Sequence, residues 1–266
     1  MAQEGFKYEE NAYDALQKYN ISIGGVAKAS HDKPDLTIQR KGDKSGCELK
    51  NSPTAAGSLV MKYYKGKWSY GDTDGDVEKE FLKALGEKFG LLKLMNTSGA
   101  AGKNWRGKVP ALQNNAQGGK ILAPGVKDKA QAYKIDIANF GGGNEVHIDV
   151  GAKAVSDYYN SKKCYYINVG THGFFLLNSS DPLKLDSTLT KLGNLSIPDF
   201  SKSAECKIRV RCQLKSTSKS DYQFAMTLQF SKVKKSPYNI APLAAGSKSN
   251  IDVKKLEKDP LLSAFL

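Results

Sequence analysis

The segment 35–51 constrains the fold more than any other part of the chain, because its pattern suits two strands joined by a turn. Residues 35–39 (DLTIQ) and 47–51 (CELKN) are short strand-like runs, and the KGDKSG between them supplies the glycine, aspartate and serine that turns favour. We therefore expect a β-hairpin over 35–51. The apolar spacing of residues 8–19 predicts a helix before it.

Further helices and strands are expected along the chain. A second hairpin at 59–71 should turn at Lys65 and Gly66, and a helix over 76–95 should be capped by Asp74 or Asp76. The later elements are expected at 134–140 (strand), 145–150 (strand), 151–161 (helix), 164–169 (strand) and 174–178 (strand). The last third should be mostly strand, with a polar tail after Lys234. This mixture predicts an α/β fold of the mixed α+β kind.

Positive charge is concentrated in two stretches. The chain has 40 Lys and Arg against 27 Asp and Glu, a net charge of +13, and the stretches 96–134 and 201–235 have net charges of +6 and +7. The first resembles a flexible glycine-rich loop, and the second alternates basic with apolar residues as an exposed strand does. A nucleic-acid partner explains this concentration, although lysines that only keep the surface soluble are the alternative. The residues expected to contact nucleic acid are Lys103, Trp105, Arg106, Lys108, Lys207, Arg209 and Arg211.

Other features bear on the compartment and on other kinds of chemistry. No apolar run reaches the roughly 20 residues of a membrane-spanning helix, and the first ten residues are polar where a secretory signal would be apolar. Four cysteines without a CxxC pair favour a reducing compartment and argue against structural zinc. We expect a cytoplasmic protein, in the host cell if it is viral, with no membrane partner. Three histidines and the lack of a GxSxG motif disfavour acyl transfer.

The first hairpin also contains the best candidate for a catalytic site. Asp35 opens one strand, whereas Glu48 and Lys50 lie two residues apart on the other and project from the same face. If the register brings Asp35 opposite them, two carboxylates and one ammonium meet at the end of the sheet. Phosphodiester hydrolysis uses such a set, because carboxylates hold Mg²⁺ while an ammonium orients the attacking water or stabilises developing charge.

The Pro-Asp pair, the twelve residues that follow it, and the Glu-Leu-Lys on the next strand resemble the motif of the PD-(D/E)XK nuclease superfamily. The resemblance covers residues 8–51. It implies a restriction-endonuclease-like core, in which a helix precedes a central mixed sheet flanked by helices. It also implies that Asp35 and Glu48 bind Mg²⁺, for which Mn²⁺ can substitute, and that Lys50 is the catalytic lysine.

Many members of this superfamily also place a glutamate on the first helix. Glu9 lies three residues before Ala12 and seven before Leu16, hence on the inward face, whereas Glu10 is turned about 100° away. We therefore prefer Glu9 as the further metal ligand. The alternative is that both glutamates only favour the N-terminal end of the helix.

The same resemblance implies a further helix and strand in a core that spans residues 1–180. Residues 151–169 offer a helix and an apolar strand in immediate succession, which would make 52–143 an insertion, while the helix at 76–95 is the competitor. We favour the first choice. The remaining segment, 181–266, is expected to be a β-rich, basic C-terminal part packed on the core.

These features predict a Mg²⁺-dependent endonuclease that cuts double-stranded DNA, of the phage, restriction or homing type. A homodimer is expected if the product is a double-strand break. The alternatives are a non-catalytic DNA-binding protein and a nuclease acting on RNA or on DNA ends. A rival metal site consists of Glu145, His147 and Asp149, which alternate along one strand, although a solvated strand face explains the same pattern.

Overall fold

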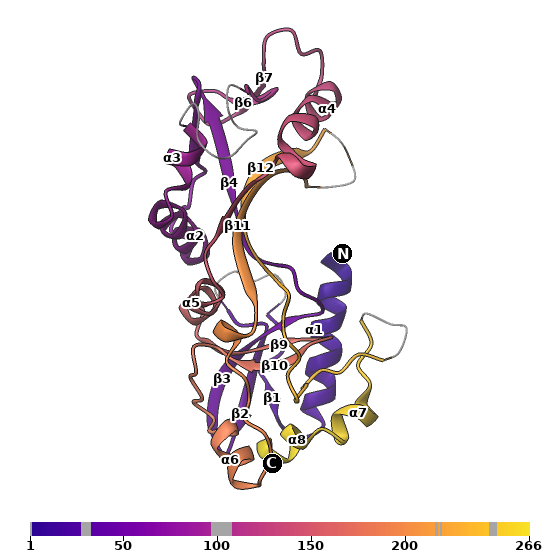
Figure 1. Cartoon of the computed structure of the whole chain (residues 1–266). Coiled ribbons are helices and arrows are strands. Elements are labelled where there is room, and N and C mark those ends of the chain that lie inside the picture. Colours follow the sequence, from indigo (N-terminus) through magenta and orange to yellow (C-terminus); the bar gives the residue numbers. More distant parts are fainter. Residues whose placement is uncertain (1, 28–32, 97–107, 216–217, 219, 245–248) are drawn as a thin grey trace. The chain divides into compact units, whose positions relative to one another are not determined.

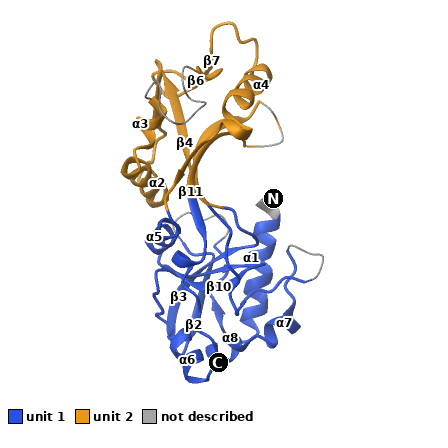
Figure 2. Cartoon of the chain, in the orientation of Figure 1, with its two compact units in different colours: residues 1–54, 151–206, 230–266 blue, residues 55–150, 207–229 orange. Residues whose placement is uncertain are grey.

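The computed structural model describes residues 2–27, 33–96, 108–215, 218, 220–244 and 249–266. The fold is of the mixed α/β class and divides into two compact units (Figures 1 and 2). The first unit comprises 1–54, 151–206 and 230–266, and the second comprises 55–150 and 207–229. The segment 181–266 is therefore shared by both units. Within the described residues, no helix is long and apolar enough to span a bilayer.

The first unit is built on a five-stranded mixed sheet with the strand order β1-β2-β3-β9-β10. These strands are β1 (Ser22–Ile23), β2 (Leu36–Arg40), β3 (Asp43–Lys50), β9 (Cys164–Val169) and β10 (Gly173–Leu176). β3 and β9 are parallel, whereas the other neighbouring pairs are antiparallel. Parallel strands need a long connection, and the one between β3 and β9 ends in α5 (Lys153–Ser161).

Helices pack on both faces of this sheet. On one face, α1 (Ala2–Gln17) buries Tyr8, Ala12 and Leu16 in a core that also contains side chains of β2 and β3. The same core includes α6 (Leu185–Lys191), α7 (Val253–Glu257) and α8 (Pro260–Phe265). On the opposite face, Phe175 of β10 packs edge-on against Phe200 of the 3₁₀ helix η2 (Phe200–Lys202), beside α5.

The tail after residue 234 belongs to the core of the first unit in spite of its polar, proline-punctuated sequence. Ile240, Leu256 and Phe265 are buried in it. Asp259 accepts the N–H of Leu261 and so begins α8. Its apolar residues fall in short runs, 240–245 and 260–266, separated by a polar stretch, and such runs alone do not show which distant core they join.

The second unit is built on a sheet with the strand order β5-β4-β12-β11-β8. The strands are β4 (Ala55–Tyr64), β5 (Lys67–Tyr70), β8 (Val146–Asp149), β11 (Glu205–Leu214) and β12 (Tyr222–Ser231). A small hairpin is formed by β6 (Leu112–Asn114) and β7 (Lys120–Leu122). The helices are α2 (Val77–Lys88), α3 (Leu91–Asn96), α4 (Lys129–Phe140) and the 3₁₀ helix η1 (Gly142–Asn144).

Local chemistry explains two confirmed predictions in the second unit. The hairpin of β4 and β5 turns at Lys65 and Gly66, whose φ angles of 45° and 81° are those of a tight two-residue turn. Helix α2 is capped by Asp76, whose Oδ1 accepts the N–H groups of Glu78 and Lys79 at 3.0 and 3.1 Å. Of the two candidate caps, Asp76 and not Asp74 is correct.

The prediction of a strand at 134–140 is wrong, because these residues form the C-terminal part of α4. Asp128 caps this helix, and the buried side chains Ala132, Asp136 and Phe140 recur every four residues, which is the spacing of a helix. The described part of the stretch expected to be a flexible loop is also ordered, since it contains β6, β7 and the first turn of α4.

Candidate active site

The hairpin of β2 and β3 sets the position of Asp35. Its turn lies at Lys41 and Gly42, whose φ angles of 51° and 92° suit a two-residue turn matched to the twist of the strands. The resulting register brings Asp35 beside the backbone of β3. There its Oδ2 accepts the N–H of Leu49 at 2.8 Å. One carboxylate oxygen is thus held by the backbone of the next strand.

Gly46 allows two neighbouring segments, which contain Pro34 and Lys163, to approach β3 closely. A Cβ atom on Gly46 would lie 2.6 Å from the carbonyl oxygen of Lys163 and 2.9 Å from the Cβ of Pro34. Any larger residue would push away the segment that contains Pro34 and the neighbouring Asp35. Glycine is therefore required at this position of β3 for the close approach of its two neighbours.

The structure brings Asp35, Glu48 and Lys50 together. The Nζ of Lys50 lies 2.5 Å from Oε1 of Glu48 and 3.6 Å from Oδ2 of Asp35. The side chain of Glu48 is only 2% exposed, whereas those of Asp35 and Lys50 are 15% and 18% exposed. A polyanionic substrate could thus reach Asp35 and Lys50 from solvent, with Glu48 beneath them.

Tyr159 of α5 and Lys162, which directly follows this helix, also belong to this group. The sequence analysis predicted neither. The Nζ of Lys162 lies 3.6 Å from Oε2 of Glu48, and its side chain is 7% exposed. The ammonium groups of Lys50 and Lys162 lie 5.7 and 5.9 Å from the centroid of the buried ring of Tyr159. Glu48 therefore contacts one lysine through each of its oxygens. No local pattern marks Lys162, because its proximity arises from the pairing of β9 with β3.

The carboxylates of this site repel one another. Burial raises the pKa of Glu48 to about 7, and the charge of Asp35 contributes. Burial and Asp35 raise the pKa of Glu9 to about 7 as well. Burial alone would lower the pKa of Lys50, but Asp35 and Glu48 raise it well above its ordinary value. The position of Glu9 on α1 thus places it within electrostatic reach of the other two carboxylates.

These residues fit a Mg²⁺ ion. Mg²⁺ prefers oxygen ligands and is often bound by one or two carboxylates together with water and substrate phosphates. Asp35 and Glu48 supply two carboxylates, and burial together with the charge of Asp35 raises the pKa values of Glu48 and Glu9, so a divalent cation bound beside them would favour their ionised forms. Among the residues that the structure describes, no three His, Cys, Asp or Glu side chains are grouped closely enough to hold a metal by themselves. Water and phosphate would therefore complete the coordination.

Of the residues expected to bind nucleic acid, those that the structure describes all lie in the second unit. Lys103, Trp105 and Arg106 lie outside the described residues. Lys108 is exposed. The stripe on β11 has the expected alternation, since the odd-numbered basic residues are half-buried and the even-numbered apolar residues are buried. The half-buried basic residues are Lys207, Arg209 and Arg211, and the buried apolar residues are Ile208, Val210 and Cys212.

The rival metal site on β8 does not assemble. Arg209 donates from Nε to one oxygen of Glu145 and from a terminal nitrogen to the other at 2.6 Å, so both oxygens are engaged. His147 lies 3.6 Å from the same carboxylate, and burial together with Lys207 lowers its pKa. Asp149 is exposed at the end of the strand. The pattern corresponds to a strand face with its own ion pair.

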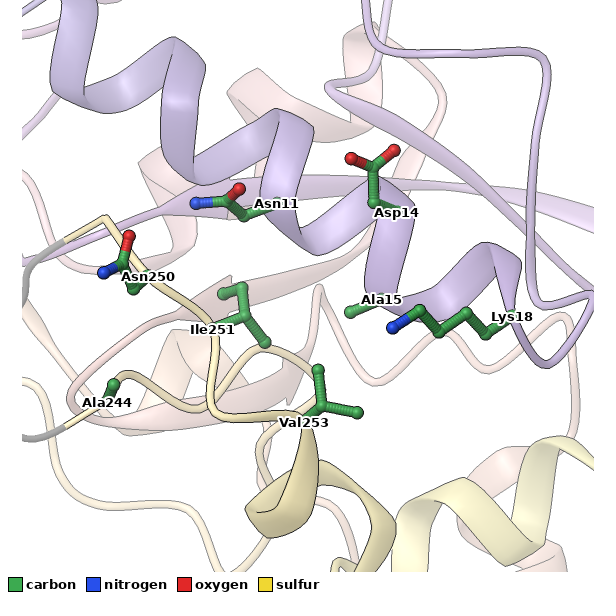
Figure 3. Close-up of a pocket in the computed structure, with 8 residues that line it drawn as sticks. All are labelled: Asn11, Asp14, Ala15, Lys18, Ala244, Asn250, Ile251 and Val253. Atoms are coloured by element: carbon green, nitrogen blue, oxygen red, sulfur yellow. The ribbon is translucent and has the colours of Figure 1, made fainter.

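A pocket of about 510 Å³ lies in the first unit between α1 and the C-terminal tail (Figure 3). Side chains from α1 face residues that precede and begin α7 across this pocket. Its lining includes Asn11, Asp14, Lys18, Asn250, Ile251 and Val253. None of the candidate active-site residues lines it, so it is a separate feature of the surface.

Comparison of the chain with protein-family models, with curated proteins and with solved structures finds no match.

Proposed function

We propose that this protein is a metal-dependent nuclease that hydrolyses phosphodiester bonds in DNA, with Asp35 and Glu48 holding Mg²⁺ and Lys50 acting on the attacking water. The observation that carries the proposal is the convergence of two carboxylates and one ammonium at the end of β3, with Lys50 within 3.6 Å of both acids. Of these residues, Asp35 and Lys50 are partly exposed and so accessible to substrate.

The topology of the first unit supports a restriction-endonuclease-like core. The resemblance implies a helix, a mixed sheet, a further helix and a further strand, and the first unit has α1, then β1 to β3, then α5 and β9. β9 pairs in parallel with β3, the strand that contains Glu48 and Lys50. The competing helix, α2, belongs to the second unit. The residues between β3 and α5 would then form the insertion.

Each residue of the site has a definite task in this proposal. A bound Mg²⁺ ion would polarise the scissile phosphate and lower the pKa of a water molecule. Asp35 is held by the N–H of Leu49 through Oδ2, and its other oxygen would be the one to bind the metal. Lys162 neutralises one oxygen of Glu48 and favours its ionised form. Lys50 would donate hydrogen bonds that orient the attacking water or stabilise the developing negative charge.

One observation favours a second candidate, a DNA-binding protein without catalytic activity. The ammonium of Lys50 is only 2.5 Å from Glu48, and Lys162 approaches the same carboxylate, so the cluster can be understood as a set of partly buried ion pairs. In that case the site would stabilise the hairpin and would bind no metal.

A nicking assay on supercoiled plasmid separates the two candidates. The nuclease cuts with Mg²⁺ and stops in EDTA, and Lys50→Ala lowers the rate by a factor of about 10² or more. Lys44→Ala is the matched control, because Lys44 is an exposed lysine on the same strand. A wild-type protein that does not cut, or a Lys50→Ala variant that cuts at the wild-type rate, contradicts the proposal. Matched DNA and RNA duplexes then identify the substrate. Linear plasmid would show that both strands are cut, by two protomers or in two binding events.

A further inference from the structure

The three basic side chains of the β11 stripe are not equivalent. Arg209 is engaged by both oxygens of Glu145 and also donates to Oε1 of Gln229 at 3.4 Å. The side chain of Glu145 is only 5% exposed, so this pair is fixed within the sheet. Arg209 therefore contributes little free positive charge to the surface, because its charge is neutralised by a neighbour.

Lys207 and Arg211 lie on either side of this pair and keep their charges. Within the described part of the chain, neither residue forms an ion pair. Among the residues that the structure describes, none accepts a hydrogen bond from the buried Nε of Arg211, and burial together with the neighbouring Arg209 lowers the pKa of Arg211. The side chain of Arg211 is half-buried, and its charge beside that of Arg209 is one that an anion at the surface would stabilise.

The opposite face of this sheet is covered, which leaves the β11 stripe on the outer face. Phe140 of α4 packs edge-on against Phe224 of β12, with ring centroids 5.3 Å apart. Gly86 of α2 contacts the ring of Tyr70 on β5. Ile208 and Val210, the apolar neighbours of the stripe, are fully buried. A sheet with one packed face and one basic face is suited to an extended anionic partner.

We propose that this outer face of β11 binds the sugar-phosphate backbone of double-stranded DNA, with Lys207 and Arg211 making the phosphate contacts and Arg209 serving to fix the strand. Lys207 and Arg211 are four residues apart, or about 13 Å along a strand, which suits contacts to separate phosphates. Asp149 pairs with Lys207 in the strand register and limits the net charge at that end. The choice of DNA as the polyanion rests on the proposed function, but the binding does not depend on cleavage.

The test measures binding of a short fluorescent DNA duplex in EDTA, where no metal-dependent cutting occurs. We expect the double variant Lys207→Ala/Arg211→Ala to bind roughly tenfold more weakly, and the slope of log Kd against log salt to fall by about 2, since each phosphate contact contributes close to one unit. The control is Lys83→Ala/Lys88→Ala, which removes the same charge from α2. This control should retain wild-type affinity and slope.

The outcomes are distinct from those of the nicking assay. The proposal is overturned if the β11 variant binds like the wild type, if both double variants weaken binding equally, or if only single-stranded DNA or anionic vesicles are bound. Should the double variant fail to fold, Lys207→Glu alone must weaken binding. If the protein binds DNA through β11 but does not cut it, the proposed nuclease function is wrong and this inference stands. If the protein cuts DNA and the β11 variant binds DNA like the wild type, this inference is wrong and the proposed nuclease function stands.

Discussion

Replacing Asp35 separates its structural role from its proposed role in metal binding. Asp35→Ala removes the acceptor of the Leu49 N–H, a bond of 2.8 Å, and leaves a donor unpaired next to a buried strand. Such a loss costs about 1–3 kcal/mol of unfolding free energy, or several degrees in Tm for a chain of this size. Asp35→Asn keeps an acceptor of the same shape, so its unfolding free energy should stay within about 0.5 kcal/mol of wild type.

Both variants lose the carboxylate charge, so both should lose Mg²⁺-dependent cleavage. The unfolding free energies are measured by urea denaturation in EDTA, and the activities by plasmid nicking. Folded Asp35→Asn without activity is the result that the geometry predicts. The reasoning fails if Asp35→Asn cuts like the wild type, or if Asp35→Ala is as stable as Asp35→Asn.

Two further predictions concern the ionisation of Glu48. Because burial raises the pKa of Glu48 in the folded state from 4.5 to about 7, the folded protein binds more protons than the unfolded chain between these values, and its stability should fall as the pH rises through that window. Urea denaturation in EDTA at several pH values should show this decline, and it should be weaker in Glu48→Gln; an equal decline in the variant would contradict the assignment. Lys162→Met removes a charge that lowers the pKa of Glu48, so the acidic limb of the pH profile for cleavage should move to higher pH. An unchanged profile would show that Lys162 has no influence on the reaction.

The parts of the fold that the sequence predicted are those governed by local chemistry. The two hairpins have turn residues at their centres, and Asp76 begins α2 as a capping residue should. The alternation along β11 likewise results from one buried and one exposed face. The hairpin over 35–51 was predicted, but its register was left open; the turn at Lys41 and Gly42 sets the register that brings Asp35 beside Glu48 and Lys50.

The parts that the sequence did not predict depend on distant partners. In α4, the isoleucines on either side of Asp136 imitate the alternation of a strand. The structure buries Asp136 instead, where it accepts the backbone N–H groups of Ala111 and Leu112 and the hydroxyl of Tyr222. These partners are far away in the sequence, so no local pattern could reveal them. Lys162 was missed for the same reason, since only the parallel pairing of β9 with β3 brings it to Glu48.

The most direct test of the proposed site is anomalous diffraction from crystals of the protein soaked in Mn²⁺. The account predicts an anomalous peak between the carboxylates of Asp35 and Glu48, which disappears in crystals of Asp35→Asn. Lack of a peak there at Mn²⁺ concentrations that support cleavage, or a peak that survives in the Asn variant, would contradict it.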